Sequence, residues 1–272
     1  MNGFADLHIH SVFSDGTLSP REIVDRAVKN GVGLIAVCDH NVVEGSIRTA
    51  PLAREAGLRF LPGVELDCLL EGCDTHILCY GADFSDARLM EIVRHARHCL
   101  DKMSDDLLER MLADFPQLSR EAYDELAFDH SLGGWKLLQY LVRAGVTDSL
   151  KGGLHFCDDY GVTYHQAGFR EAAEVIAAIH AAGGCAILAH PGVTFSDVNA
   201  GLQAALRCGI DGVECHYPKH SQALTETLLA FCAENGLCVT AGSDCHGAFG
   251  SADVGETRTL ADALSLRHAA FA

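Results

Sequence analysis

The sequence predicts an α/β protein with a parallel, barrel-like arrangement of strands and a mainly helical insertion. Three observations support this prediction. The chain has 272 residues, a normal length for an α/β barrel. Residues 1–85 and 169–272 alternate short apolar runs with amphipathic helical patterns, as repeating β–α units do. Residues 86–168 lose this alternation and carry many charged residues and histidines at helical spacing.

Four strands and two helices are expected before the insertion. The strands cover residues 4–9, 34–38, 59–66 and 76–81. Ser19 fits the N-cap of the first helix, with Pro20 at its first position and Glu22 placed to complete a capping box. The second helix covers residues 47–56 and is closed by Gly57, because glycine readily adopts the conformation that follows a helix.

The insertion and the last third of the chain complete the prediction. In the insertion, helical patterns cover residues 86–114, 119–126 and 135–144. After it, helices are expected at residues 170–182, 198–208 and 223–235, and strands at residues 185–189, 212–215 and 237–241. The sequence therefore predicts seven strands, four before the insertion and three after it.

Composition and charge restrict the classes of function. The formal net charge of −17 repels a phosphate backbone, so long nucleic acid is not expected as a partner. A small phosphorylated substrate is compatible with this charge, because bound metal ions reverse the local field. Neither a membrane span nor a secretion signal is recognisable, so we expect a cytoplasmic protein. The twelve cysteines form no C-x-x-C pair and are expected to be reduced, mostly buried thiols.

Side chains that can bind metal ions follow or end most of the predicted strands. His8 and His10 are two residues apart in an extended segment, so both imidazoles point to the same side. The ends of the other strands and the loops after them supply Asp15, His40, Glu65, His76, His190, Glu214, Asp244 and His246. Each motif alone is also common at a surface or in a turn. Barrel enzymes build their active sites from the ends of many strands, so the joint pattern predicts a metal-dependent hydrolase.

These residues occur in motifs that together are specific. The motifs are Asp6-Leu7-His8-Ile9-His10, Ser14-Asp15-Gly16, Asp39-His40, Pro62-Gly63-Val64-Glu65, His76, Ala189-His190-Pro191, Gly212-Val213-Glu214 and Gly242-Ser243-Asp244-Cys245-His246. In them the sequence resembles the PHP family, named for polymerase and histidinol phosphatase, and is most similar to its stand-alone metal-dependent phosphoesterases. The resemblance implies a distorted seven-stranded β/α (TIM-like) barrel with an inserted helical cap.

The resemblance also implies two to three divalent metal ions and assigns their ligands. One ion is held by His8, His10, Glu65 and Asp244, and Glu65 bridges to a second ion held by His76 and His190. Asp15, His40 and His246 hold a third. Glu65, Asp244 and His190 are accordingly the expected catalytic residues. Imidazoles mixed with carboxylates suit manganese, iron or zinc.

The sequence departs from this family in the insertion. Related enzymes often have a Ser-Arg-x-His segment that helps to hold phosphate, whereas residues 131–136 read Ser-Leu-Gly-Gly-Trp-Lys and lack the arginine. Val193 also stands where some relatives have arginine. Lys136, His216 and His220 are the candidate substrate contacts, although each can equally be a surface residue.

We therefore expect hydrolysis of a small phosphomonoester or nucleotide-like phosphate ester by a metal-activated water. Three alternatives remain open from the sequence. The same metal ions could cleave a non-phosphorylated ester or amide, or short oligonucleotides. A non-enzymatic metal-binding module is the third alternative, but it predicts eroded ligands, and all nine ligand positions are filled. The oligomeric state is not predicted.

Overall fold

The computed structural model describes residues 3–266, which form an α/β fold with eight strands in two sheets. The first sheet is parallel and has the order β1 (Phe4–Ile9), β2 (Val32–Val37) and β3 (Arg59–Phe60). The second contains β4 (Gly63–Leu70), β5 (Cys73–Tyr80), β6 (Cys185–Leu188), β7 (Gly212–His216) and β8 (Cys238–Ala241) in sequence order. The described strands thus do not form the closed seven-stranded barrel that we expected.

Two local features explain the difference. The predicted strand at residues 59–66 is divided, because Pro62 has no backbone N–H to donate to a ladder. The part before Pro62 pairs with β2, and the part after it pairs with β5. In addition, β5 is antiparallel to both β4 and β6. Glu71 and Gly72, with φ of 50° and 84°, form a two-residue turn that returns the chain directly beside β4.

Isolated bridges connect the two sheets at the end where the His, Asp and Glu motifs meet. Ile9 pairs with Cys245, just beyond β8, and His40, just beyond β2, pairs with Glu65 in β4. Backbone hydrogen bonds from Asn41 N–H to the Glu65 carbonyl and from Glu65 N–H to the Asp39 carbonyl hold the second junction. The ends of β1 and β2 therefore lie beside the second sheet.

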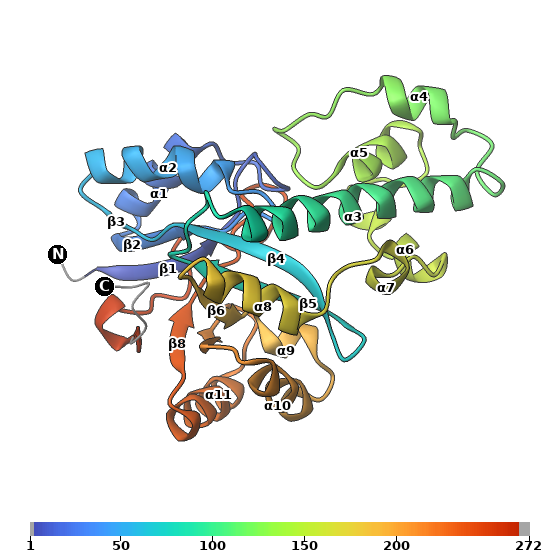
Figure 1. Cartoon of the computed structure of the whole chain (residues 1–272). Coiled ribbons are helices and arrows are strands. Elements are labelled where there is room, and N and C mark those ends of the chain that lie inside the picture. Colours follow the sequence, from blue (N-terminus) through green and yellow to red (C-terminus); the bar gives the residue numbers. More distant parts are fainter. Residues whose placement is uncertain (1–2, 267–272) are drawn as a thin grey trace.

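Helices cover the sheets outside this junction (Figure 1). They are α1 (Pro20–Lys29), α2 (Glu44–Glu55), α8 (Ala172–Ala181), α9 (Pro191–Thr194), α10 (Val198–Cys208) and α11 (Gln222–Asn235). The expected capping box at the start of α1 is present, with Ser19 and Glu22 each accepting from the other's backbone N–H. The main core is formed by β4–β7 packed against α3, α8, α10 and α11, and includes Leu66, Leu188 and Leu228.

The insertion is mainly helical, as expected. It contains α3 (Ala87–Met111), α4 (Arg120–Glu125), α5 (Lys136–Arg143), α6 (Phe156–Asp159) and α7 (Tyr164–Ala167), and one 3₁₀ turn at Lys151–Gly153. The first half of α3 contributes Leu89 and Ile92 to the main core. Its second half packs with the other insertion helices around a separate core that includes Leu108 and Leu141. Figure 1 shows α3 running past the sheets, with α4 and α5 near its far end.

No helix among residues 3–266 combines the length and apolar character needed to cross a membrane. None of the twelve cysteines, all of which lie in the described part of the chain, forms a disulfide, and most are buried, as we expected. A second 3₁₀ turn, Ala261–Ala263, follows the last strand.

Candidate metal centre

The first donor cluster is built on β1 and β4. His8 and His10 are fully buried, and their Nε2 atoms lie 3.1 Å apart. Glu65 Oε2 lies 3.1 Å from His8 Nε2 and 3.2 Å from His10 Nε2. Asp244, in the turn after β8, places Oδ1 3.1 Å from His10 Nε2 and 3.6 Å from His8 Nε2. The four side chains expected to share one ion therefore converge on one point.

The second cluster uses the other oxygen of the same glutamate. Glu65 Oε1 lies 3.2 Å from His76 Nδ1 on β5 and 3.3 Å from His190 Nε2, just after β6. The two carboxylate oxygens of Glu65 thus face two different groups of imidazoles. This is the arrangement that a carboxylate bridging two ions requires.

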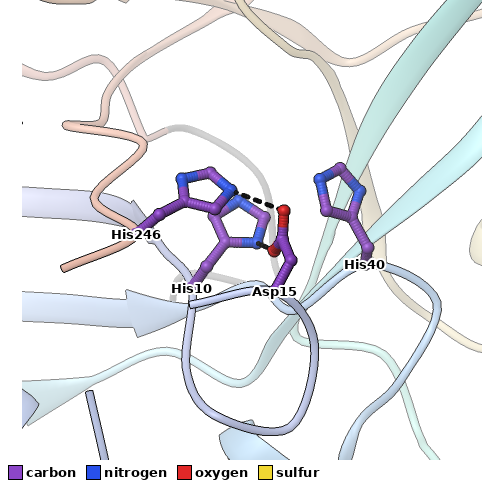
Figure 2. Close-up of side chains that lie close together, drawn as sticks. All are labelled: His10, Asp15, His40 and His246. Atoms are coloured by element: carbon purple, nitrogen blue, oxygen red, sulfur yellow. Dashed lines mark ion pairs between the residues drawn. The ribbon is translucent and has the colours of Figure 1, made fainter. Parts of the chain in front are cut away.

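The third cluster contains Asp15, His40 and His246 together with His10 (Figure 2). Asp15 Oδ2 lies 3.2 Å from His246 Nε2, and Asp15 Oδ1 lies 3.5 Å from His10 Nδ1. Figure 2 shows the Asp15 carboxylate between the ring of His246 and that of His40. His10 belongs to both the first and the third cluster, so all three are contiguous.

Asp67 also belongs to this centre, although the sequence analysis missed it. Its Oδ1 accepts a hydrogen bond of 3.0 Å from His40 Nδ1 and lies 3.3 Å from His76 Nε2. Its Oδ2 accepts from Asn41 Nδ2. Asp67 follows Glu65 by two residues in β4, so period-two alternation places it on the same face. That signal was lost because the predicted strand ended at residue 66.

Further buried carboxylates orient the ligands. Glu214 accepts a 3.1 Å hydrogen bond from His8 Nδ1 and a 2.9 Å bond from the His190 backbone N–H. Glu214 was predicted at a strand end without a role, and such outer carboxylates fix the tautomer of a ligand histidine. Two ligands have positive φ, 26° for His190 and 53° for Asp244, which is strained backbone of the kind found at functional sites.

The electrostatics of the centre couple its acids to its histidines. Burial alone raises the pKa of Glu65, but the surrounding imidazoles of His8, His40 and His76 hold it well below its usual range. Burial likewise opposes protonation of His8 and His246, yet neighbouring carboxylates raise both pKa values, that of His246 to about 9. A site without ions therefore holds protons on imidazoles that metal ions would displace.

Unpartnered polar atoms test whether metal ions fit this centre. His10 Nδ1, His76 Nδ1 and both carboxylate oxygens of Glu65 are buried and accept or donate no hydrogen bond. Leaving such atoms unpaired is costly, and metal coordination would satisfy them. Neighbouring ligands of one ion at about 2.1 Å are separated by about 3.0–3.4 Å, which the donor distances match. The donor set therefore fits divalent ions of the manganese, iron or zinc type.

A cavity of about 720 Å³ opens onto the centre. Asp15, His40, Asp67 and His76 form one end of it, and the insertion supplies most of the remaining wall. Tyr164 of α7 reaches the centre itself, with its Oη 3.3 Å from His76 Nε2. The loop before α5 is anchored there by a 2.8 Å bond from the Gly134 N–H to the Asp15 carbonyl.

The three candidate substrate contacts occupy different places. Lys136 lines the 720 Å³ cavity. His216 lines a separate cavity of about 310 Å³ with Tyr217 and Glu256. His220 engages backbone groups through both ring nitrogens, accepting from the Gly192 N–H and donating to the Cys215 carbonyl. A substrate contact by His216 or His220 stays a prediction.

The chain is similar to known proteins in both sequence and structure. The family model described as "PHP domain" matches residues 6–239. A 5'-3' exoribonuclease of Haemophilus influenzae is 28% identical over 95% of this chain and 96% of its own length. A 3',5'-nucleoside bisphosphate phosphatase of Chromobacterium violaceum is 28% identical, with coverage of 94% and 92%.

Solved structures agree with these matches. A proposed metal-dependent phosphoesterase from Bifidobacterium adolescentis superposes with a TM-score of 0.78 at 28% identity, covering 95% of this chain and 93% of its own. The chain described here therefore belongs to the PHP domain family.

Proposed function

We propose that this chain is a metal-dependent phosphoesterase that hydrolyses a small phosphomonoester or nucleotide-like phosphate ester. The observation that carries the proposal is the contiguity of three donor clusters around Glu65 and His10. They meet a cavity of about 720 Å³, a volume typical of small-molecule sites. The bisphosphate phosphatase and the exoribonuclease among its relatives are both named for cleaving phosphate esters.

Divalent ions bound here would supply an acidified water and positive charge for the phosphoryl oxygens. In this proposal, His8, His10, Glu65 and Asp244 hold the first ion, and Glu65, His76 and His190 hold the second. Asp15, His40 and His246 hold the third. Glu65, Asp244 and His190 are the proposed catalytic residues, because their donor atoms lie where the clusters adjoin.

Other residues orient the candidate ligands and enclose the cavity. Glu214 holds the ring of His8 so that Nε2 points to the cluster. The insertion covers the cavity and separates a bound ester from bulk water, and we propose that residues 86–168 act as a substrate cap. Lys136 is the proposed substrate contact from this cap, as a single point charge.

The proposal is tested by metal analysis followed by a substrate panel. Protein purified without chelator should contain divalent metal, and the Mn²⁺-loaded protein should release phosphate from small phosphomonoesters. Asp244→Ala should remove nearly all of this activity and lower the bound metal, because it deletes a proposed ligand of the first ion. Turnover of esters or amides with no turnover of any phosphate ester would refute the phosphoesterase proposal.

A second candidate is an exonuclease that removes nucleotides from short RNA. It is favoured by the H. influenzae relative, which aligns over nearly the whole of both chains. The net charge of −17 opposes it for long nucleic acid. Release of mononucleotides from a 5'-phosphorylated oligoribonucleotide, faster than phosphate release from any monoester, would support this candidate over the first.

A further inference from the structure

The cavity wall supplied by the insertion is mainly apolar and aromatic. Leu100 and Met103 of α3, Tyr123 of α4, Phe128 and Trp135 of the loop before α5, and Tyr164 of α7 all line it. Phe128 and Trp135 are only half-buried where they line the cavity, whereas the ring of Tyr164 already stacks on Phe169. Flat rings exposed in a cavity bind other flat rings by stacking, whatever their hydrogen-bonding pattern.

The charges on the same wall are mostly negative. Away from the metal ligands and Asp67, the lining includes Asp74, Asp101, Asp105, Asp124 and Asp158 but only two cations, Arg97 and Lys136. Arg120 lies behind the wall and pairs with Asp105 at 2.7 Å and with Asp124 at 3.6 Å. Asp74 and Asp158 make no ion pair with any residue in the described part of the chain.

Both cations of the wall are already engaged. Arg97 Nε lies 3.3 Å from Asp101 Oδ1, one helical turn along α3. Lys136 Nζ lies 4.6 Å from the centre of the Tyr123 ring and donates to the Asp124 carbonyl. A second phosphate in the cavity would therefore have to compete with Asp101 for the Arg97 guanidinium, and carboxylates nearby would repel it.

From these walls we propose that the site selects phosphate esters with one phosphoryl group and an uncharged aromatic remainder. A nucleoside monophosphate or an aryl phosphate has this chemistry. Nucleoside bisphosphates and phosphorylated oligonucleotides do not, because they bring further phosphate into the acidic wall. The inference rests on the proposed phosphoesterase function, since the single phosphoryl group is assigned to the metal centre.

The experiment compares kcat/KM of the Mn²⁺-loaded protein on four substrates. Glycerol 2-phosphate reports phosphoesterase activity without a ring, and adenosine 5'-monophosphate adds the ring. Adenosine 3',5'-bisphosphate and 5'-phosphorylated diadenylate add further phosphate. We expect the monophosphate to exceed glycerol 2-phosphate by about tenfold, a ratio that one stacking contact provides. We also expect it to exceed the bisphosphate and the dinucleotide, because their further phosphate meets the carboxylates of the wall.

Three variants and one control show which residues produce the selectivity. Trp135→Ala should lower the ratio of monophosphate to glycerol 2-phosphate activity at least fivefold, and Trp135→Phe, which keeps a ring, should restore most of it. Leu132→Ala, an exposed position in the same loop, is the matched control. Asp158→Arg should raise the relative activity on the bisphosphate, because it adds a guanidinium to the wall.

The outcomes separate the two proposals. Hydrolysis of glycerol 2-phosphate with equal or higher activity on the bisphosphate or the dinucleotide overturns the selectivity inference and leaves the phosphoesterase function standing. An unchanged substrate ratio in Trp135→Ala also overturns it. Failure to hydrolyse any of the four esters refutes the phosphoesterase proposal, and the inference that rests on it falls as well.

Discussion

Replacement of Asp67 by asparagine should weaken metal binding at two positions at once. The Oδ1 atom of Asp67 contacts both His40 and His76, which are proposed to bind different ions. Asparagine has nearly the same size, but only one of its two terminal atoms accepts hydrogen bonds. The substitution therefore tests the carboxylate itself and not the space that it fills.

The surrounding hydrogen bonds prevent asparagine from compensating. Asn41 Oδ1 accepts from the Asp67 backbone N–H at 3.1 Å, which directs its NH₂ group toward the residue 67 side chain. If the new amide oxygen faced the two histidines, its NH₂ would face that of Asn41. In the opposite orientation, an NH₂ group would face both imidazoles. Either way, at least one of the three contacts becomes a donor–donor clash.

The size of the expected loss in metal affinity follows from the role of carboxylates that hydrogen-bond to metal-binding histidines. Loss of one such partner typically reduces metal affinity about 10- to 100-fold, or about 1.4–2.7 kcal/mol. Because two ligand histidines are affected, we expect a loss toward the upper end. Titration of chelator-treated protein with Mn²⁺, following free Mn²⁺ by electron paramagnetic resonance, measures this directly. Asp25→Asn, an exposed position on α1, is the matched control. Wild-type affinity and stoichiometry in Asp67→Asn would refute the reasoning.

Two further predictions concern stability. In chelator-treated protein, the melting temperature should fall as the pH rises from 6.5 to 9. The pKa of His246 is raised to about 9 in the folded protein, so protonation of this histidine stabilises the fold fully below pH 6.5, and that contribution disappears as the pH rises through 9. Added Mn²⁺ should reverse much of this loss, because it binds neutral imidazole. A melting temperature that rises with pH in the presence of chelator, measured by scanning fluorimetry, would contradict the prediction. Gly133→Ala should lower the free energy of unfolding by about 1–3 kcal/mol more than Gly145→Ala, measured in urea. Both glycines have φ of +69°, but only at position 133 does an added Cβ meet other atoms, namely Asp15 O and Phe249 Cβ at 2.7 Å. Equal losses of unfolding free energy in the two variants would be evidence against this crowding.

The convergence of the candidate ligands could be predicted from the sequence, because strand periodicity and the resemblance to the PHP family both point to these positions. His8 and His10 share a face through strand periodicity, and the motif containing Asp244 directly follows a strand. The arrangement of the sheets was harder to predict, because it depends on one proline and one tight turn. Pro62 divides a predicted strand, and Glu71-Gly72 makes β5 antiparallel. Both signals were visible in the sequence, but their effect depends on which strands are neighbours.

A helical insertion near the site was predicted, but the lining of the cavity could not be, because its walls come from segments far apart in the chain. The part of the insertion beyond the first half of α3 has an apolar core of its own, whereas the first half of α3 joins the core of the sheets. Wall residues that belong to this separate core can therefore change with little effect on the candidate ligands. Two contacts are exceptions: the Gly134 N–H bonds to the Asp15 carbonyl, and Tyr164 Oη reaches His76. Each joins the cap to a residue of the metal centre. We therefore expect substitutions at Gly134 and Tyr164 to disturb metal binding more than substitutions elsewhere in the wall supplied by the insertion, because, among the described residues of that wall, these two contact Asp15 and His76.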